Sequence, residues 1–500
     1  MVDDEGLGTW LARRRARSPQ AIAIIFGDEE WTYAQLADRS GAIAGLLSAR
    51  GIGAGDRVAY FGGNSPSFIA TLFACASLGA VFVPVNTRLA GPEIVHVLTD
   101  CEARVLIRDE AAFGAIDSAI AEWPNADVVT LAQLAQAVNP VAPATPVKLD
   151  DPVVVIYTSG TTGLAKGAVL SHRNLTWVAL NCIIDYDVVR ADVALMISPL
   201  FHVASLGMGA LPILMKGATI VLERGFEAGR ALELIEKNHV TMLSGVPTTF
   251  EMMANHPQWE ATDISSLSKL TCGGSPAPLH LIEAFERRGL HFSQGYGMTE
   301  AAPSVSALSP DKSLDKLGSV GLAHFFTRFR IVDKRGREVA PTVIGEIEVT
   351  GPNVFSGYLG LPEANAVAFT EDGWFKTGDL GYVDDEGFLY IEGRVKDLII
   401  SGGENIYPVE VEALIEQLPA VEAVAVVGLA DARWGEVPWA VVTLAEGAQL
   451  ELEELQESLR DRVAKYKIPK GLVIVDELPR TATGKIKKQA LRKRLAEGSL

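Results

Sequence analysis

A β-branched apolar segment that runs directly into a glycine-rich loop constrains this sequence more than any other feature. Val153 to Ile156 suit a buried strand, and the stretch from Val155 to Ala168 reads Val-Ile-Tyr-Thr-Ser-Gly-Thr-Thr-Gly-Leu-Ala-Lys-Gly-Ala. Glycines permit tight turns, while backbone N–H groups, hydroxyls and a lysine can donate to an anion. We therefore predict a strand that feeds a phosphate-binding loop, with candidate ligands Thr158, Ser159, Gly160, Thr161, Thr162, Gly163 and Lys166.

The spacing of this loop excludes the Walker phosphate loop. At the offsets that this motif requires after Gly160, the chain has Ala165, Lys166 and Gly167. Both the second glycine and the magnesium-binding Ser or Thr are therefore missing. An ordinary Gly/Ser/Thr surface turn is the plain alternative, and the other motifs of the chain argue against it.

Helix and strand patterns alternate along most of the chain. An amphipathic helix is predicted between residues 31 and 50 and a strand over 58–61, and the alternation continues to residue 293. Such alternation is typical of βαβ units in mostly parallel sheets. From 318 to 392, short strands separated by Gly and Asp turns predict a small β-rich subdomain.

The pattern begins again near residue 395. Strands at 398–400, 423–427 and 440–444 and helices at 409–417 and 452–466 predict a separate small domain. We therefore expect an α/β protein. Its large N-terminal domain, residues 1–394, would hold two helix-flanked sheets and the β-rich subdomain. A small mobile α+β domain, residues 395–500, would follow a hinge at the charged segment after Gly393.

Composition excludes several classes of protein. A net charge of −18 argues against nucleic acid as a partner. Four scattered cysteines indicate neither a disulfide framework nor a zinc site, which favours a reducing, cytoplasmic location, and no signal peptide is evident. No charged residue lies between Arg57 and Arg88, but Pro66 and Gly79 delimit a buried helix before a strand at 81–84, so no membrane span is predicted.

Further motifs follow the phosphate loop in order. They are Cys272-Gly-Gly-Ser-Pro276, Gly295-Tyr-Gly-Met-Thr-Glu300, Trp374-Phe-Lys-Thr-Gly-Asp379 and Pro479-Arg-Thr-Ala-Thr-Gly-Lys485. Together they resemble the signatures of the adenylate-forming superfamily, which comprises acyl-CoA and aryl-CoA synthetases, luciferases and peptide-synthetase adenylation domains. The resemblance covers nearly the whole chain, with one departure, since Ala165 replaces the family's usual proline.

The resemblance implies a role for each matching residue. Tyr296 would stack on adenine beside Gly297, Thr299 would donate to the α-phosphate, and Glu300 would hold Mg²⁺. Lys485 would be catalytic and, with Thr299, Glu300 and His202, make up the reacting site; His202 would lie between acid pocket and thiol tunnel. Gly273, Gly274, Ser275 and Pro276 would form the wall against adenine and ribose. Asp379 would accept hydrogen bonds from the ribose hydroxyls, and Arg394 would bind the ribose and its phosphate. Lys396 would be the pivot of the small domain, and Gly402 and Gly403 would line the thiol tunnel.

The expected activity is an ATP-dependent acid–CoA ligation through an acyl-adenylate, with ATP, Mg²⁺ and coenzyme A. Residues 203–207 and 301–303, the expected pocket walls, are small and mostly apolar, and include no Arg or Lys to pair a second carboxylate. We therefore expect an apolar monocarboxylic acid and favour a fatty acid, with a hydroxycinnamate (feruloyl or p-coumaroyl) as the alternative. Two alternative functions remain open, a non-catalytic ATP-binding protein and a luciferase-like oxygenase. A homodimer likewise remains open.

Overall fold

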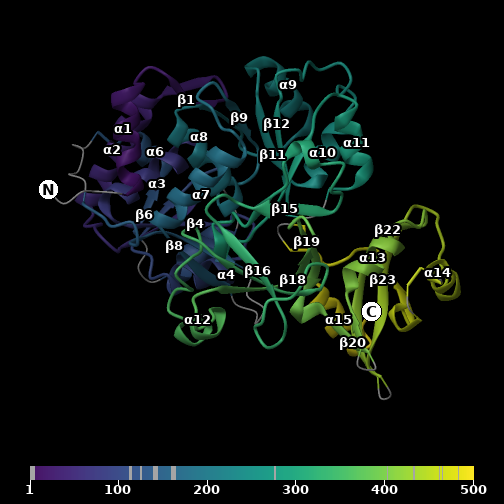
Figure 1. Cartoon of the computed structure of the whole chain (residues 1–500). Coiled ribbons are helices and arrows are strands. Elements are labelled where there is room, and N and C mark those ends of the chain that lie inside the picture. Colours follow the sequence, from purple (N-terminus) through teal and green to yellow (C-terminus); the bar gives the residue numbers. More distant parts are fainter. Residues whose placement is uncertain are drawn as a thin grey trace. The chain divides into compact units, whose positions relative to one another are not determined.

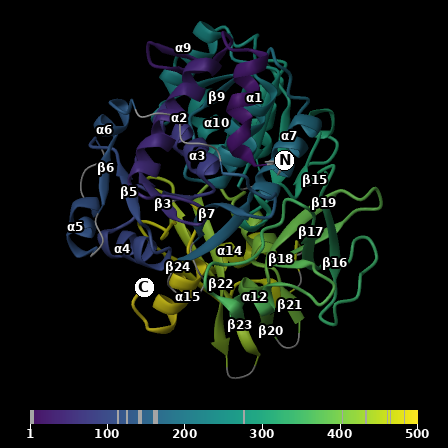
Figure 2. The same ribbon diagram turned by 90° about the vertical axis from the view of Figure 1, so that its left-hand side faces the viewer.

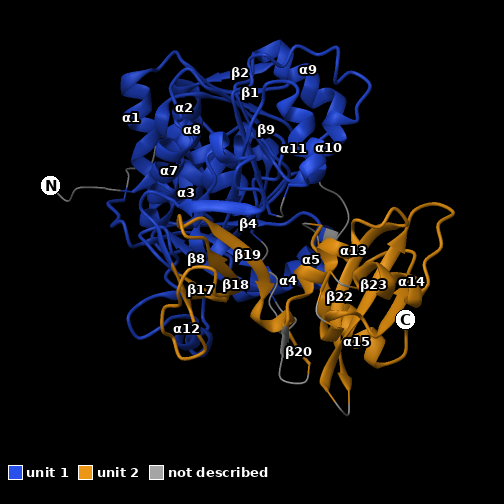
Figure 3. Ribbon diagram, turned by 45° about the vertical axis from the view of Figure 1, so that its right-hand side comes forward, with its two compact units in different colours: residues 1–329, 349–375 blue, residues 330–348, 376–500 orange. Residues whose placement is uncertain are grey.

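The computed structural model describes residues 6–111, 115–123, 127–138, 145–158, 165–274, 277–401, 404–431, 434–460, 462–463, 465–481 and 484–500. It divides into two compact units, coloured separately in Figure 3. Unit 1 comprises residues 1–329 and 349–375, and unit 2 comprises residues 330–348 and 376–500. Residues 376–394 thus group with the C-terminal residues, while the predicted hinge after Gly393 stays a prediction.

A six-stranded sheet in unit 1 carries the strand that precedes the phosphate loop. Its order is β6-β5-β3-β4-β7-β8, and only the β7–β8 pair is antiparallel. Strands β4, β6 and β8 of this sheet are labelled in Figure 1. The strands are β3 (Arg57–Phe61), β4 (Val81–Val85), β5 (Val105–Arg108), β6 (Val128–Thr130), β7 (Pro152–Thr158) and β8 (Lys166–Ser171). The helices before β9 are α1 (Trp10–Arg17), α2 (Tyr33–Ala49), α3 (Pro66–Leu78), α4 (Gly91–Asp100), α5 (Ala115–Glu122), α6 (Leu131–Ala135) and α7 (His172–Asp185).

A second sheet of unit 1 has the order β2-β1-β10-β9-β11-β12-β13-β14-β15, with parallel pairing from β1 to β13. Its strands are β1 (Ile22–Phe26), β2 (Glu29–Thr32), β9 (Val193–Met196), β10 (Thr219–Leu222), β11 (Met242–Gly245), β12 (Lys269–Gly273), β13 (Phe292–Tyr296), β14 (Ser306–Ala307) and β15 (Ser319–Ala323). Its helices are a π-helix (Ala204–Ala210), α8 (Leu211–Lys216), α9 (Ala228–Asn238), α10 (Pro247–Ala254) and α11 (Leu279–Glu286); α12 (Pro362–Ala368) follows later.

Strand alternation explains how both faces of these sheets are buried. In β3, Val58 and Tyr60 join a large core with α2, α3, α7 and β10, whereas Ala59 and Phe61 face the smaller core under α4 and α5. Helices α9, α10 and α11 cover the opposite face of the second sheet. Figure 2 shows α2 and α3 lying side by side within the large core. Parallel strands with near-continuous apolar sequences are expected when both faces are covered.

Unit 2 builds its own core around a long antiparallel hairpin of β22 (Val421–Asp431) and β23 (Gly435–Leu444). Val424 and Val426 face α13 (Pro408–Ile415) and α14 (Leu452–Leu459), and Ala425 and Val427 face α15 (Lys488–Ala496). The other strands are β16 (Arg328–Val332), β17 (Gly345–Thr350), β18 (Phe375–Val383), β19 (Leu389–Arg394), β20 (Ile399–Ser401), β21 (Glu404–Ile406) and β24 (Gly471–Ile474).

The α/β fold class and most predicted elements are confirmed. The uncharged run forms α3 and β4: the Ser65 hydroxyl caps Phe68 N–H and Gly79 adopts the left-handed conformation that ends the helix. In the described part of the chain, no helix is long and apolar enough to cross a membrane. The predicted helix 452–466 was too long, because Arg460 takes an extended conformation and α14 ends at Leu459. Strand β8 was not predicted.

Candidate active site

Two motifs of unit 1 meet at one edge of the second sheet. Strands β12 and β13 are parallel, and their register pairs Gly273 with Gly295. Their carboxyl ends therefore bring Gly273 and Gly274 beside Tyr296, at the edge where open α/β sheets bind ligands. Gly274 has φ +84°, a conformation that favours glycine.

The turn after β13 is held by close backbone contacts. A Cβ on Gly297 would lie 1.3 Å from the Pro303 carbonyl oxygen, so only glycine fits. Thr299–Ala301 form one turn of 3₁₀-helix, and Phe355 N–H donates to the Glu300 carbonyl (2.8 Å). The backbone of the Thr299-Glu300 motif is thus fixed by residues that come more than fifty positions later.

Tyr358 connects Glu300 with the lysine of the phosphate loop. Its hydroxyl donates to Glu300 Oε1 (2.9 Å), and Lys166 Nζ lies 5.4 Å from the centre of its ring. Leu359 N–H donates to the Gly167 carbonyl (2.8 Å), which ties this segment to β8. The structure therefore brings Lys166 and Glu300 to the same tyrosine. Sequence analysis missed Tyr358, although the glycine-rich segment from Gly351 to Tyr358 marks an unusual turn.

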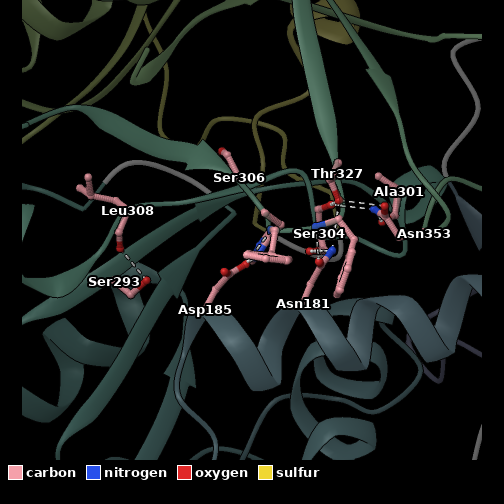
Figure 4. A network of polar contacts seen from close by, with 12 residues as sticks. Asn181, Asp185, Ser293, Ala301, Ser304, Ser306, Leu308, Thr327 and Asn353 are labelled. Atoms are coloured by element: carbon pink, nitrogen blue, oxygen red, sulfur yellow. Dashed lines mark hydrogen bonds and ion pairs between the residues drawn. The ribbon is translucent and has the colours of Figure 1, made fainter. Parts of the chain in front are cut away.

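A buried polar network lies beneath the same turn (Figure 4). The Asn353 amide donates to the carbonyls of Ala301 (2.8 Å) and Ser304 (2.7 Å) and accepts from the Thr327 hydroxyl (2.8 Å). Asn181 of α7 donates to the hydroxyls of Ser304 (3.2 Å) and Thr327 (3.1 Å). These side chains were also missed, because isolated polar residues in a sequence carry no periodic signal.

The expected acid-pocket walls contact each other within unit 1. A Cβ on Gly207, in the π-helix, would lie 2.8 Å from the Ala302 carbonyl and 3.5 Å from a methyl of Val178 on α7. His202 precedes this helix and accepts, through its carbonyl, the N–H of Leu206 (3.1 Å). Burial, with a smaller contribution from the Arg88 charge, lowers the pKa of His202 to about 4. The imidazole is therefore neutral at physiological pH.

Three predicted residues come together in unit 2. Asp379 and Arg394 are register partners in the antiparallel β18–β19 pair, and Arg394 Nε lies 2.9 Å from the buried Asp379 carboxylate. Lys485 follows Gly484, which has φ +85°, in a tight turn closed by Thr481 N–H donating to the Lys485 carbonyl (2.7 Å). Loss of solvent around its ammonium group is the larger cause that lowers the pKa of Lys485, although the residue as a whole is exposed. The positive charge of Arg394 is the second cause, and the same two causes lower the pKa of Lys396.

Several predicted residues fall outside the described part of the chain. They are Ser159, Gly160, Thr161, Thr162, Gly163, Ser275, Pro276, Gly402 and Gly403. Thr158 ends β7, where its hydroxyl lies 3.5 Å from the Lys166 carbonyl. The two strands that flank the predicted phosphate loop are therefore β7 and β8.

Comparisons with known proteins identify the family of this chain. The family profile described as AMP-binding enzyme matches residues 11–359, and that of the AMP-binding enzyme C-terminal domain matches residues 410–485. The chain belongs to the AMP-binding enzyme family. This AMP-binding enzyme is an AMP-forming acid–CoA ligase, an acid–thiol ligase, as its relatives and its fold show.

The relatives of this AMP-binding enzyme are named for different acids. A feruloyl-CoA synthase of an Amycolatopsis species is 46% identical, over 98% of this chain and 99% of the relative. The long-chain-fatty-acid–CoA ligase FadD13 of Mycobacterium tuberculosis is 36% identical, over 97% of each chain. The solved o-succinylbenzoate CoA synthetase (MenE) of Bacillus subtilis, in complex with its acyl-adenylate intermediate, is 35% identical with a TM-score of 0.88, covering 97% and 98% of the two chains.

The donor atoms of this AMP-binding enzyme suit a magnesium ion carried by a nucleotide. Glu300 offers a hard carboxylate oxygen, the ligand type that Mg²⁺ prefers. Among the described residues, no three His, Cys, Asp or Glu side chains gather as a complete metal site. Mg²⁺ commonly takes one or two carboxylates and completes its shell with phosphate oxygens and water, so a single glutamate fits that mode of binding.

Proposed function

We propose that this ligase activates a hydroxycinnamate-type aromatic acid, such as ferulate or p-coumarate, to its CoA ester. The observation that carries the proposal is the 46% identity to a feruloyl-CoA synthase over almost the full length of both chains, against 36% for a fatty-acid ligase. The preference for a fatty acid drawn from the pocket residues is not confirmed. Small pocket residues fit a flat ring as well as a narrow alkyl chain.

In the proposed first step, a carboxylate oxygen of the acid attacks the α-phosphorus of ATP. The new P–O bond gives the acyl-adenylate, and the bond to the β-phosphate breaks to release pyrophosphate. Two anions meet in this step, so cations and N–H donors must offset their repulsion. We assign Lys166, Lys485 and the Thr299 hydroxyl to that task, and Glu300 to the Mg²⁺ that neutralises phosphate charge.

In the second step, the thiol sulfur of CoA forms a bond with the acyl carbon, and the C–O bond to AMP breaks. The thiol proton leaves with the departing AMP or to solvent. We assign Tyr296, Gly273 and Gly274 to the adenine, Asp379 and Arg394 to the ribose and its phosphate, and His202 to the wall between acid and thiol. The neutral state of His202 leaves one ring nitrogen able to accept and one able to donate a hydrogen bond.

A substrate panel tests the proposal. CoA-ester formation is measured with ferulate, p-coumarate, cinnamate, octanoate, palmitate and malonate at equal concentrations. We expect kcat/KM to be highest for ferulate or p-coumarate, and malonate to be rejected because a second, unpaired carboxylate would be buried. Faster turnover of either fatty acid than of every aromatic acid would contradict the proposal.

A further inference from the structure

Two neighbouring polar side chains of unit 1 each carry one buried atom that has no hydrogen-bond partner among the described residues. Asp185 ends α7, Tyr186 follows it, and His324 follows β15. The His324 side chain is fully buried and its Nδ1 hydrogen-bonds to Asp185 Oδ2. Among the described residues, neither His324 Nε2 nor the buried Tyr186 hydroxyl has a partner.

The two rings are neighbours. Their centres lie 5.9 Å apart in an edge-to-face arrangement. Ser293 lies beside Tyr186 and donates its own hydroxyl hydrogen to the Leu308 carbonyl (2.7 Å). The serine oxygen could still accept a hydrogen, but its contact with the Tyr186 hydroxyl lies outside hydrogen-bond geometry. Buried polar groups are normally paired, so two orphan atoms on neighbouring rings point to a ligand group that is recognised here.

Helix α7 places this pair along the acid-pocket wall. Val178 lies against Gly207 and thus next to Ala302. Asn181 donates to the Ser304 hydroxyl, and Asp185 lies at the end of the same helix (Figure 4). The spacing of three and four residues puts these positions on one face of the helix. Seven residues of helix span roughly 10 Å, so the Asp185 end lies about that far along the wall from Val178.

Strand β13 of the second sheet also lies next to the His324–Tyr186 pair. A Cβ on Gly295, next to the predicted adenine-stacking Tyr296, would lie 3.6 Å from the Tyr186 hydroxyl and 3.3 Å from the Ser306 carbonyl. Ser306 pairs with Tyr296 in one direction and with Ala323, which precedes His324, in the other. The pair of rings therefore lies just behind the strand that carries the nucleotide signature.

The protonation states define what the pair can bind. A carboxylate only accepts, so the Asp185 contact keeps a hydrogen on His324 Nδ1, and in the neutral imidazole Nε2 is then the acceptor. Burial raises the pKa of Tyr186 well above its usual value, so its hydroxyl stays protonated and can donate. One acceptor and one donor side by side complement a group that both donates and accepts, which is a phenol hydroxyl.

We propose that His324 and Tyr186 bind the ring hydroxyl of the acid, so that this ligase selects hydroxylated aromatic acids over their unsubstituted analogues. The proposal rests on the proposed function and specifies it. His324 Nε2 accepts the phenol hydrogen and Tyr186 donates to the phenol oxygen. An acid without this hydroxyl leaves both groups unpaired, a situation that sites built for hydrogen bonding reject strongly.

The test compares p-coumarate with cinnamate, which differ only in that hydroxyl. We expect wild-type kcat/KM to favour p-coumarate by roughly 10²-fold or more, and Tyr186→Phe to reduce this ratio roughly tenfold by lowering the p-coumarate value alone. Because the Tyr186 hydroxyl has no partner among the described residues, the variant should fold. His324→Leu is the second variant; Asp185 would retain the Phe325 N–H (3.2 Å).

Tyr60→Phe is the matched control, since it removes a buried hydroxyl that contacts Ser65 (2.9 Å) elsewhere in unit 1. It should leave the ratio unchanged. If both acids are ligated and neither Tyr186→Phe nor His324→Leu alters their ratio, the inference is wrong and the proposed function stands. If fatty acids alone are ligated, the proposed function itself is wrong, and the inference falls with it.

Discussion

At Glu300 a hydrogen bond from Tyr358 orients the carboxylate. The Tyr358 hydroxyl holds one oxygen at 2.9 Å, and the ring of the same tyrosine lies near Lys166 Nζ. The residue predicted to hold Mg²⁺ and the lysine of the phosphate loop are therefore oriented by one side chain. We assign Tyr358 a positioning role, because its hydroxyl contacts Glu300 and its ring lies near Lys166.

Tyr358→Phe separates the two functions of this tyrosine. The ring and its contact with Lys166 remain, while Glu300 loses a hydrogen bond to a charged group that is worth about 1.5 kcal/mol. We expect the Mg²⁺ concentration for half-maximal pyrophosphate release to rise roughly tenfold, the equivalent of that energy. Tyr157→Phe removes the same kind of bond, from a tyrosine hydroxyl to Asp100 Oδ2 (2.6 Å), and should leave the Mg²⁺ dependence unchanged.

At the scale of elements, the turn from Thr299 to Ser304 has no regular structure beyond one 3₁₀ turn, yet it carries the proposed metal ligand and one expected wall of the acid pocket. Its carbonyl groups cannot pair within a helix or a sheet ladder. Asn353 replaces that ladder by donating to two of them, and Thr327 and Asn181 complete the network. A loop held in this way can be both irregular and precise.

Asn353→Leu should remove this support. It removes one hydrogen bond from each of two carbonyls and one acceptor from the Thr327 hydroxyl, at about 1 kcal/mol for each hydrogen bond lost. The Ala301 carbonyl keeps the Ser304 N–H (2.9 Å), and the Ser304 carbonyl can keep the Thr327 hydroxyl (3.2 Å). We expect a clearly lower thermal unfolding temperature and a loss of adenylation that saturating ATP does not restore. Asn238→Leu, which removes one amide bond to the Leu234 carbonyl on α9, is the control and should change both much less. Equal effects of the two substitutions would contradict this role for Asn353.

At the scale of the whole molecule, the candidate residues are divided between the two units. Lys166, His202, Thr299 and Glu300 belong to unit 1, and Asp379, Arg394 and Lys485 belong to unit 2. The two half-reactions differ in what they need: the first joins two anions, and the second displaces AMP with a thiol. Because the candidate residues are divided between the two units, the two proposed half-reactions can depend on different residues.

Lys485→Ala tests that separation. Loss of one preorganised cation should cost roughly 3 kcal/mol in the transition state of adenylation, about a 10²-fold slower pyrophosphate release. Supplied with synthetic acyl-adenylate and CoA, the variant should form product at close to the wild-type rate. Lys487→Ala, two residues further along the chain, is the control and should affect neither half. An equal loss in both halves would show that Lys485 serves the whole reaction.

The sequence alone determined the features that depend on residues adjacent in the chain, namely helix boundaries and contiguous motifs. The helix from Pro66 to Leu78 follows from a Ser cap and a Gly stop. The motifs around Lys166, Glu300 and Lys485 are contiguous in sequence and lie within the segments that the family profiles match. The predicted helix 452–466 was too long, because the local sequence does not mark its end. Arg460 departs from helical geometry, and no Gly or Pro stands there to indicate it.

The tertiary structure decided the polar contacts that position those motifs. Tyr358 reaches Glu300 across 58 residues, and His324 reaches Asp185 across 139. Such pairs have no periodicity in the sequence, and each polar residue in isolation resembles a surface residue. They become meaningful only when folding buries them, because burial makes every unpaired donor or acceptor costly and so turns a hydroxyl, an amide or an imidazole into a specific contact.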